Sequence, residues 1–352
     1  MPDETAFYKQ TVATATGAQV IALETDCSVG PGPIMLRYGQ ATAGETEFEL
    51  ESLEVQVPAG EAFPDRLRPD VHPIFSRFPR WSGTVSAGCG ANWVGTMTNL
   101  EYRGRSRSGS GATIVRPRLP PLEEEYFEWI DLLEAVAEAR DSFTMVELGA
   151  GWGRWLVDAW GALCRIDKSD LPVQLIGVEA EPQHFAWMRD HFRNNGLDPD
   201  RHRLIEAAVM ARDGSTGFQI GAATDWYGQQ ALNIDNDLGG CLPDYPDVSL
   251  RRVPAVSLST VLDGIPFVDL IDMDIQGSEA DVVLASIDLL QAQVRRVHIG
   301  THCEAIEASL RQAFRSMGWT CRWDFSLQGH RDTPYGRVLF GDGVQGWINP
   351  RL

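Results

Sequence analysis

Three glycines at alternate positions constrain the fold more than any other feature of the chain. Gly149, Gly151 and Gly153 stand in the segment VELGAGWGR, directly after the apolar run FTMVEL and directly before a segment expected to be helical. Glycine lets the backbone turn sharply and approach a ligand closely. The segment therefore predicts a strand, a tight turn and a helix that bind a cofactor at the carboxyl edge of a sheet.

Short apolar runs and helical segments alternate through the rest of the chain. The runs are VQLIGVE, RLIEAAV, VDLIDMDI, VRRVHIG and WTCRWDF, with YGRVLF and VQGWI as the last edge strands. This alternation predicts an α/β fold, in which a mostly parallel sheet has helices on both faces.

An amphipathic helix is predicted just before the glycine turn, after Pro120 and Pro121. Apolar residues recur there at spacings of three and four, which is typical of a helix with one buried face. The stripe consists of Leu122, Tyr126, Trp129, Ile130, Leu133 and Val136.

Residues 1–118 differ from the rest of the chain. They contain no helical period, and their short β-rich runs between Gly and Pro turns predict a β-rich N-terminal accessory domain. Residues 119–352 form the predicted cofactor-binding domain. A chain of 352 residues is long enough for two domains.

The charge of the chain limits its partners. A formal net charge of -19 disfavours binding to phosphate backbones and to anionic membrane surfaces. No apolar segment is long enough to span a bilayer, and the six cysteines are scattered without the spacing of a disulfide framework or a zinc site. We therefore expect a cytoplasmic protein with no nucleic acid partner and no membrane insertion, and a homo-oligomer is left open.

The glycine spacing separates two classes of cofactor. The dinucleotide fingerprint of nicotinamide dehydrogenases, G-x-G-x-x-G, would need a glycine at position 154 when it starts at Gly149, and the chain has Arg154 there. A start at Gly151 fails too, because Arg154 and Leu156 occupy the glycine positions. The observed spacing, E-x-G-x-G-x-G, fits a cofactor without a pyrophosphate. It favours S-adenosyl-L-methionine.

Carboxylates after three successive strands complete the predicted cofactor site. We expect Glu147 to hold the amine of the methionine part, Glu179 to accept hydrogen bonds from the ribose hydroxyls, and the segment at Glu206 to lie beside adenine. The predicted cofactor-binding residues are Glu147, Gly149, Ala150, Gly151, Trp152, Glu179, Ala180, Glu206, Ala207 and Ala208.

The chain resembles the FkbM-type methyltransferase family in VELGAGWGRW, GVEAEPQHF, AAVMARDG and VSLSTVLDGIPFVDLIDMDIQGSEADVV. The resemblance covers roughly residues 140–320, and its most specific part is Asp269 to Glu279. It implies a class I methyltransferase, Rossmann-like fold and methylation of a hydroxyl on a sugar, glycolipid or polyketide-like product. Residues 1–118 lie outside the resemblance, so it implies nothing about their role.

Methyl transfer to a hydroxyl needs a group that removes the hydroxyl proton. Asp274 is the first candidate, because it follows a strand whose carboxyl end opens onto the ligand crevice. The alternative for Asp274 is a helix cap or a turn carboxylate. His302, past the end of the next strand, is the second candidate, whereas His298 within that strand is expected to be a core histidine. Asp274 and His302 could also bind a divalent metal together with Glu304.

A Gly- and Asp-rich insert between the third and fourth strands supplies candidate acceptor-binding residues. Trp226, Tyr227 and Gln229, with Asn233, offer aromatic faces and amides that suit a sugar ring or a flat product. The alternative is a surface loop pinned by one buried tryptophan.

These patterns predict an S-adenosylmethionine-dependent methyltransferase with a carboxylate or histidine base, and the family resemblance implies that it is an O-methyltransferase active on a sugar or natural product. Two alternatives remain: an N-methyltransferase, and a non-catalytic carbohydrate- or metabolite-binding protein that retains the cofactor pocket.

Overall fold

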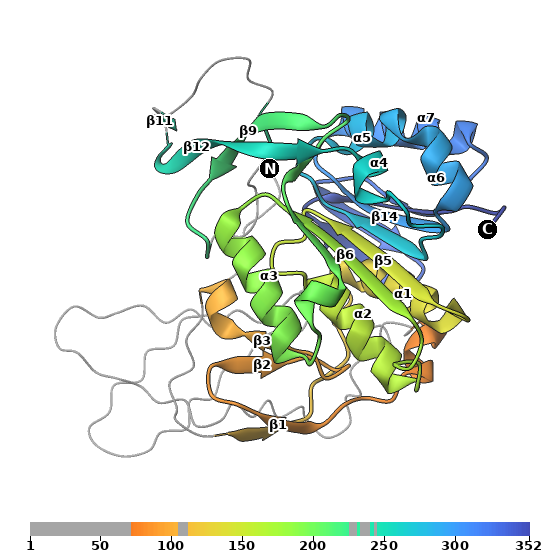
Figure 1. Cartoon of the computed structure of the whole chain (residues 1–352). Helices are drawn as coiled ribbons and strands as arrows, with labels where there is room; N and C mark the ends of the chain where they lie inside the picture. The colour runs from red at the N-terminus through yellow and green to blue at the C-terminus, as the bar shows by residue number, and fades with distance from the viewer. Residues whose placement is uncertain (1–71, 105–111, 225–230, 233–239, 243–244) are drawn as a thin grey trace, which may run out of the picture. The chain divides into compact units, whose positions relative to one another are not determined.

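The computed structural model describes residues 72–104, 112–224, 231–232, 240–242 and 245–352. Pro69–Leu352 form one compact unit. A mixed sheet runs through this unit and carries helices on both faces (Figure 1).

The strand order of this sheet defines the fold. Its strands, in spatial order, are β15 (Thr320–Phe325), β18 (Gly343–Ile348), β14 (Arg296–Thr301), β13 (Leu270–Met273), β5 (Phe143–Leu148), β6 (Val173–Glu179) and β7 (Arg203–Glu206). The strands from β14 to β7 are parallel, whereas β18 is antiparallel to both of its neighbours. A parallel sheet with its first strand in the middle and one antiparallel strand inserted near an edge is the class I methyltransferase fold. The prediction of this fold is confirmed.

Alternating side chains of the strands build one core on each face of the sheet. Met145 of β5 and Leu270 of β13 pack with the helices of one face, α1 (Glu125–Glu138), α2 (Arg154–Arg165) and α3 (Pro182–Asn194). Val146 and Ile271 face the opposite core, under α4 (Leu258–Val261), α5 (Glu279–Ala285), α6 (Ile287–Gln293) and α7 (Glu304–Ser316).

Helix α1 confirms the predicted amphipathic pattern. Tyr126, Trp129, Ile130, Leu133 and Val136 are all buried in the first core. The helix begins at Glu125, so Leu122 precedes it and packs against the core from the preceding segment.

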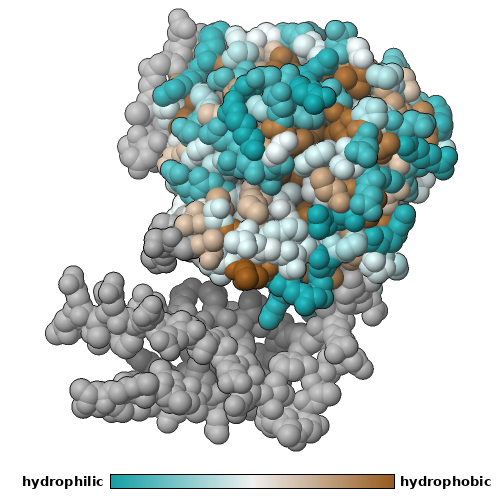
Figure 2. Space-filling model, turned by 60° about the horizontal axis from the view of Figure 1, so that its bottom comes forward, coloured by the Kyte–Doolittle hydropathy of each residue, from teal (hydrophilic) through white to brown (hydrophobic). Residues whose placement is uncertain are grey.

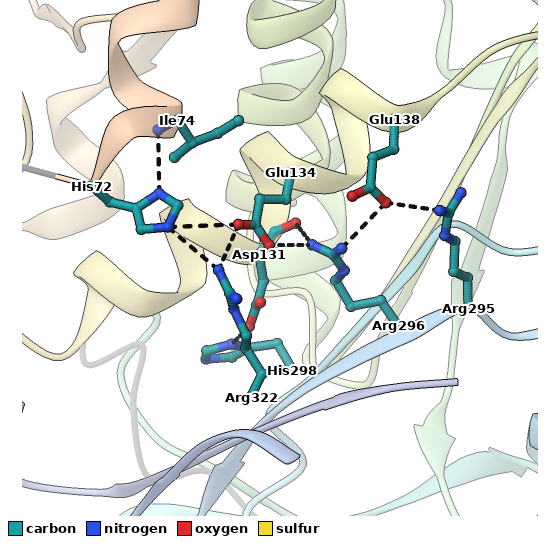
Figure 3. Close-up of polar contacts among 9 residues, drawn as sticks. All are labelled: His72, Ile74, Asp131, Glu134, Glu138, Arg295, Arg296, His298 and Arg322. Carbon is teal, nitrogen blue, oxygen red and sulfur yellow. Dashed lines mark hydrogen bonds and ion pairs between the residues drawn. The ribbon is translucent and has the colours of Figure 1, made fainter. Parts of the chain in front are cut away.

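The face of α1 toward the sheet is also acidic, which its apolar stripe does not reveal (Figure 3). Arg296 of β14 donates to Glu134 at 3.0 Å, to Glu138 at 3.3 Å and to the Asp131 carbonyl at 3.2 Å. Arg322 of β15 also donates to Glu134, at 2.6 Å. Ion pairs therefore join the helix to two strands that lie far from it in the sequence.

The described part of the N-terminal region is a set of short elements on the α1–α3 face (Figure 1). They are η2 (Pro73–Arg77), β1 (Gly83–Val85), β2 (Cys89–Ala91), β3 (Met97–Asn99), η3 (Leu100–Arg103) and β4 (Thr113–Val115), with β1 paired to β4 and β2 to β3. Asn92 and Thr96 donate to the buried Asp158 of α2. Described residues of the segment 72–118 thus pack on the helices of this face, and the expected boundary at residue 118 stays a prediction.

Small strands form outside the main sheet. Between the third and fourth strands, β9 (Gly214–Ile220) and β12 (Tyr245–Val256) form a sheet with β8 (Ala208–Val209), β10 (Ala231–Leu232) and β11 (Gly240–Leu242). The expected edge strand at residues 335–340 is wrong, since β17 (Gly336–Phe340) pairs with β16 (Gly329–Thr333) in a separate hairpin. The segment at 344–348 lies in β18, which is one strand in from the edge. A short η4 (Pro199–Arg201) precedes β7.

The described surface is mixed in character. On the face in Figure 2, hydrophobic residues occur in small patches between hydrophilic ones. None of the helices among the described residues is long and apolar enough to cross a membrane.

Candidate active site

The glycine turn joins three strands at the carboxyl edge of the sheet. The Gly149 and Ala150 amides both donate to the Val178 carbonyl of β6 at 3.0 Å. Gly149 has φ 79°, and a Cβ there would lie 1.8 Å from the carbonyl oxygen of Asp274, which follows β13. Only glycine fits position 149, because any side chain would push the turn away from β13.

Glu147 lies beneath this turn. Its carboxylate accepts hydrogen bonds from the Trp155 amide at 3.4 Å and the Leu156 amide at 3.1 Å, in the first turn of α2. Burial raises the pKa of Glu147 well above its usual range. The side chain thus secures the start of the helix behind the turn, and its expected role toward the cofactor amine stays a prediction.

Glu179 ends β6 and closes the turn from the other side. Its carboxylate accepts from the Gly151 amide at 2.6 Å and from the Glu181 amide at 2.7 Å. Burial raises the pKa of Glu179, although these two backbone donors oppose that effect. Each oxygen keeps a second lone pair, which a ribose hydroxyl could use. An added Cβ at Gly151 would meet no atom of the described residues within 4 Å, its two chain neighbours aside, and this open space leaves room for a ligand.

The third strand completes this side of the crevice. Glu206 pairs with Glu179 in the register of β6 and β7, and its side chain is exposed. Ala180, Ala207 and Ala208 are buried. The carboxylates expected at the ribose and adenine positions therefore lie on adjacent strands.

Trp152 packs away from solvent, against η3 and α3. Its ring centroid lies 5.9 Å from that of Tyr102, and the Arg103 guanidinium lies 5.7 Å from its ring. Its carbonyl oxygen is 3.0 Å from Nδ1 of His191, whose pKa burial lowers to about 4. The N-terminal elements therefore cover part of the cofactor turn, a role that no pattern in residues 1–118 indicates.

Three polar side chains meet where β13 and β14 end, and we call them the crevice triad: Asp274, Glu279 and His302. His302 Nδ1 lies 2.9 Å from Glu279 Oε1, and His302 Nε2 lies 3.2 Å from Asp274 Oδ1. Glu279 also accepts from the Ile275 and Gly277 amides, at 3.2 and 3.0 Å. Asp274 and His302 were thus placed together by sequence, whereas the pairing of His302 with Glu279 was missed, although Glu279 closes the segment DIQGSE.

The two carboxylates govern the charge of His302. Burial alone would lower the pKa of its imidazole, but hydrogen bonding and charge from Asp274 and Glu279 raise that pKa to about 10. His302 is therefore an imidazolium at neutral pH and is not free to accept a proton. Asp274, whose side chain is 51% exposed, is the accessible carboxylate of the triad.

Two more carboxylates, Glu124 and Asp342, lie near the triad. Together with Asp274 and Glu279 we call them the acidic edge. Glu124 accepts from the Gly341 amide at 2.9 Å and the Asp342 amide at 3.3 Å, which holds the end of β17 against the N-terminus of α1. Burial raises the pKa of Asp342, and the charges of Asp274 and Glu279 raise it further, against His302. Several carboxylates therefore lie around His302 at this edge of the sheet.

A metal ion could be held by the crevice triad, whose ligand atoms lie within 4.8 Å of one another. Glu304, expected as the third ligand, is exposed at the start of α7, and among the described residues Glu279 takes its place in this group. The expected acceptor-binding residues Trp226, Tyr227, Gln229 and Asn233 lie outside the described residues.

The strand order, the glycine turn and the carboxylates at the ends of β5 and β6 together define a class I S-adenosylmethionine-dependent methyltransferase. Residues 166–320 match the model of the methyltransferase FkbM domain. A protein from Jannaschia sp. (strain CCS1) named "Putative methyltransferase" is 30% identical over 206 residues, which are 56% of this chain and 69% of that protein. The chain belongs to the FkbM methyltransferase family.

Solved structures with lower identity were also found. Methyltransferase FkbM from Methylobacillus flagellatus KT is 15% identical and aligns with 60% of this chain and 45% of its own, with a TM-score of 0.37. Precorrin-6y C5,15-methyltransferase from Geobacter metallireducens GS-15 is 11% identical over 65% of this chain and 89% of its own, with a TM-score of 0.36.

Proposed function

We propose that this enzyme transfers the methyl group of S-adenosyl-L-methionine to a hydroxyl of a sugar or natural-product acceptor. The observation that carries this proposal is the crevice triad, which stands beside the glycine turn at the carboxyl edge of the sheet. Asp274 links the triad to the glycine turn. Its backbone oxygen lies against Gly149, and its side chain faces His302.

The residues of the turn fit the cofactor. Glu179, buried and already bonded to Gly151, suits a ribose diol, and Gly149 and Gly151 leave the approach free of side chains. When bound, S-adenosyl-L-methionine supplies an electrophilic methyl group on a sulfonium. Glu147 maintains the turn from below, through the first amides of α2.

Asp274 is the proposed base. A hydroxyl oxygen becomes strongly acidic as a methyl group bonds to it, so a carboxylate within hydrogen-bond distance suffices to take its proton. Glu279 contacts one ring nitrogen of His302 and favours the imidazolium, and the other ring nitrogen orients the Asp274 carboxylate. Asp274, the first of the two predicted candidates, thus keeps the role of base, and His302, the second, becomes a positioning residue.

The acidic edge favours one alternative acceptor. Carboxylates attract a cationic amine, so an N-methyltransferase is the second candidate. A screen with labelled cofactor against matched alcohols and amines separates the two. Methylation of amines alone would exclude the O-methyltransferase.

The variant Asp274→Asn tests the proposed base. Replacing Asp274→Asn removes the base but keeps the side-chain shape, so methylation should fall by about 100- to 10,000-fold. Binding of S-adenosylhomocysteine, measured by calorimetry, should change little.

Asp281→Asn is the matched control, because Asp281 is exposed in the first turn of α5, close to Asp274 in the chain. It should leave the rate unchanged. Equal rates for the two variants would remove Asp274 from the mechanism.

A further inference from the structure

A row of polar side chains crosses the sheet beneath α1, where a core would ordinarily be apolar. Glu147 of β5, Asp272 of β13 and His298 of β14 are direct neighbours in the strand register. All three are buried. They lie on the α1 face, because the alternate residues Val146, Ile271 and Val297 fill the opposite core.

Helix α1 adds a carboxylate to this row. Glu128, Asp272 and His298 each offer one ligand atom, and these atoms all lie within 4.8 Å of one another. We call these three residues the α1 cluster. It shares no residue with the crevice triad, whose members come from the ends of β13 and β14 and from α5.

A neighbouring carboxylate fixes the orientation of His298. Asp131 Oδ2, from the next turn of α1, lies 2.7 Å from His298 Nδ1, and both side chains are almost fully buried (Figure 3). With Nδ1 bonded to Asp131, Nε2 is left for a further partner. Metal-binding histidines in proteins are commonly held in this way by a carboxylate on the other ring nitrogen.

Asp272 is the most deeply placed carboxylate of the α1 cluster. Its residue is 6% exposed, and among the described residues nothing hydrogen-bonds or ion-pairs with its carboxylate. Burial is the largest of the effects that raise the pKa of Asp272 to about 7, and burial also raises that of Glu128. A buried carboxylate without a partner is costly, and a bound cation would remove that cost.

We propose that Glu128, Asp272 and His298 bind a divalent transition-metal ion that fastens α1 to the sheet. One imidazole nitrogen and two carboxylate oxygens suit Mn²⁺, Fe²⁺ or Zn²⁺. Bonds of about 2.0–2.2 Å in tetrahedral geometry place two ligand atoms roughly 3.5 Å apart, so ligand atoms that lie within 4.8 Å of one another would close by up to about 1.3 Å around the ion. The site is structural, and it does not rest on the proposed reaction.

The test uses Mn²⁺ and the full chain after removal of metals by a chelator. Electron paramagnetic resonance measures free Mn²⁺ during titration, and Zn²⁺ is the competitor. All proteins carry His302→Gln, which removes the histidine of the crevice triad. The parent should bind one Mn²⁺, and Asp272→Asn should weaken that binding at least about tenfold.

Glu134→Gln is the control, because it removes one charge from the same helix outside the α1 cluster. Its Mn²⁺ affinity should match that of the parent. Failure of the parent to bind Mn²⁺ at millimolar concentration, or equal affinity in the Asp272→Asn protein, would overturn the proposal and leave only protons in the cluster.

Thermal unfolding shows whether Asp272→Asn loses Mn²⁺ binding because it loses the site or because it does not fold. In chelator, Asp272→Asn should unfold at or above the melting temperature of the parent, because it removes an unpartnered buried charge. Added Mn²⁺ should raise the melting temperature of the parent and of Glu134→Gln, but not that of Asp272→Asn. The same Mn²⁺-induced rise in all three would contradict a site at Asp272.

Discussion

His302 is the residue whose chemistry depends most on its neighbours. Alone, an imidazole titrates near neutral pH and suits proton transfer. Between Asp274 and Glu279 it keeps its proton, and it becomes a fixed positive charge among carboxylates. The residue type therefore suggests a base, whereas the carboxylates around it raise its pKa and favour the protonated form.

The stability of the protein should report this charge as a function of pH. The pKa of His302 is raised from 6.5 in the unfolded chain to about 10 in the folded one. A raised pKa contributes stability that is fully present below pH 6.5 and is lost as pH rises through about 10. Urea unfolding of wild type and His302→Gln, in chelator, should therefore show a difference that shrinks across this window. A difference that grows with pH would contradict the assigned charge.

The sequence predicted the site residues that lie on a single strand end, and it missed those that pair across elements. Asp274 and His302 follow apolar runs, so their place at the crevice follows from the parallel sheet. Glu279 was missed as the partner of His302 because 23 residues separate them, and Glu304 was expected because it is close in sequence. Proximity along the chain is a poor guide there, since Glu304 opens the next helix and points outward.

At the scale of elements, α1 combines two kinds of docking. Its apolar stripe was readable from residue spacing. Its acidic stripe was not, because Glu134 meets Arg296 across 162 residues of sequence and both are polar. Buried ion pairs of this kind fix where a helix sits along a strand more than they add to stability.

Neighbouring arginines provide a test of this docking. Arg296 is 3% exposed in its side chain and pairs with two glutamates of α1, whereas Arg295 is 31% exposed and, within the described part of the chain, pairs only with Glu138. Arg296→Ala should destabilise the protein by about 1–3 kcal/mol, because it removes a buried guanidinium that bonds two glutamates and the Asp131 carbonyl. The loss stays below that of a fully broken buried pair, since Arg322 and Arg295 still pair with these glutamates.

Arg295→Ala should cost about 1 kcal/mol or less, as expected for an exposed pair. Chemical denaturation measures both variants. Similar losses for the two arginines would show that the α1 network is not the anchor that its burial indicates.

At the scale of the whole molecule, the methyltransferase unit begins before the first long helix. Sequence periodicity starts near residue 119, because the helices and long strands start there. The structure shows that earlier residues finish the core: Trp93 packs on Trp129 at 5.2 Å between ring centroids, and Asn92 donates to Asp158. Irregular segments carry no period, so their packing could not be predicted from the sequence.

Two shortened chains test this boundary. A chain that begins at Pro69 should keep the thermal stability of the described unit. A chain that begins at Leu119 should lose about 3–6 kcal/mol or fail to fold, because Trp129 loses its cover and Asp158 its donors. Melting temperature and circular dichroism measure the outcome. Equal stability of the two would restore a separate accessory domain ending near residue 118.

The acidic edge also bears on the release of the spent cofactor after each reaction. The methyl donor carries a sulfonium charge, and the thioether left after transfer is neutral at that atom. Carboxylates such as Asp274 and Asp342 therefore attract the fresh cofactor more strongly than the spent one. Under the proposed function, the same charges that surround the acceptor would favour exchange of by-product for donor and so limit product inhibition.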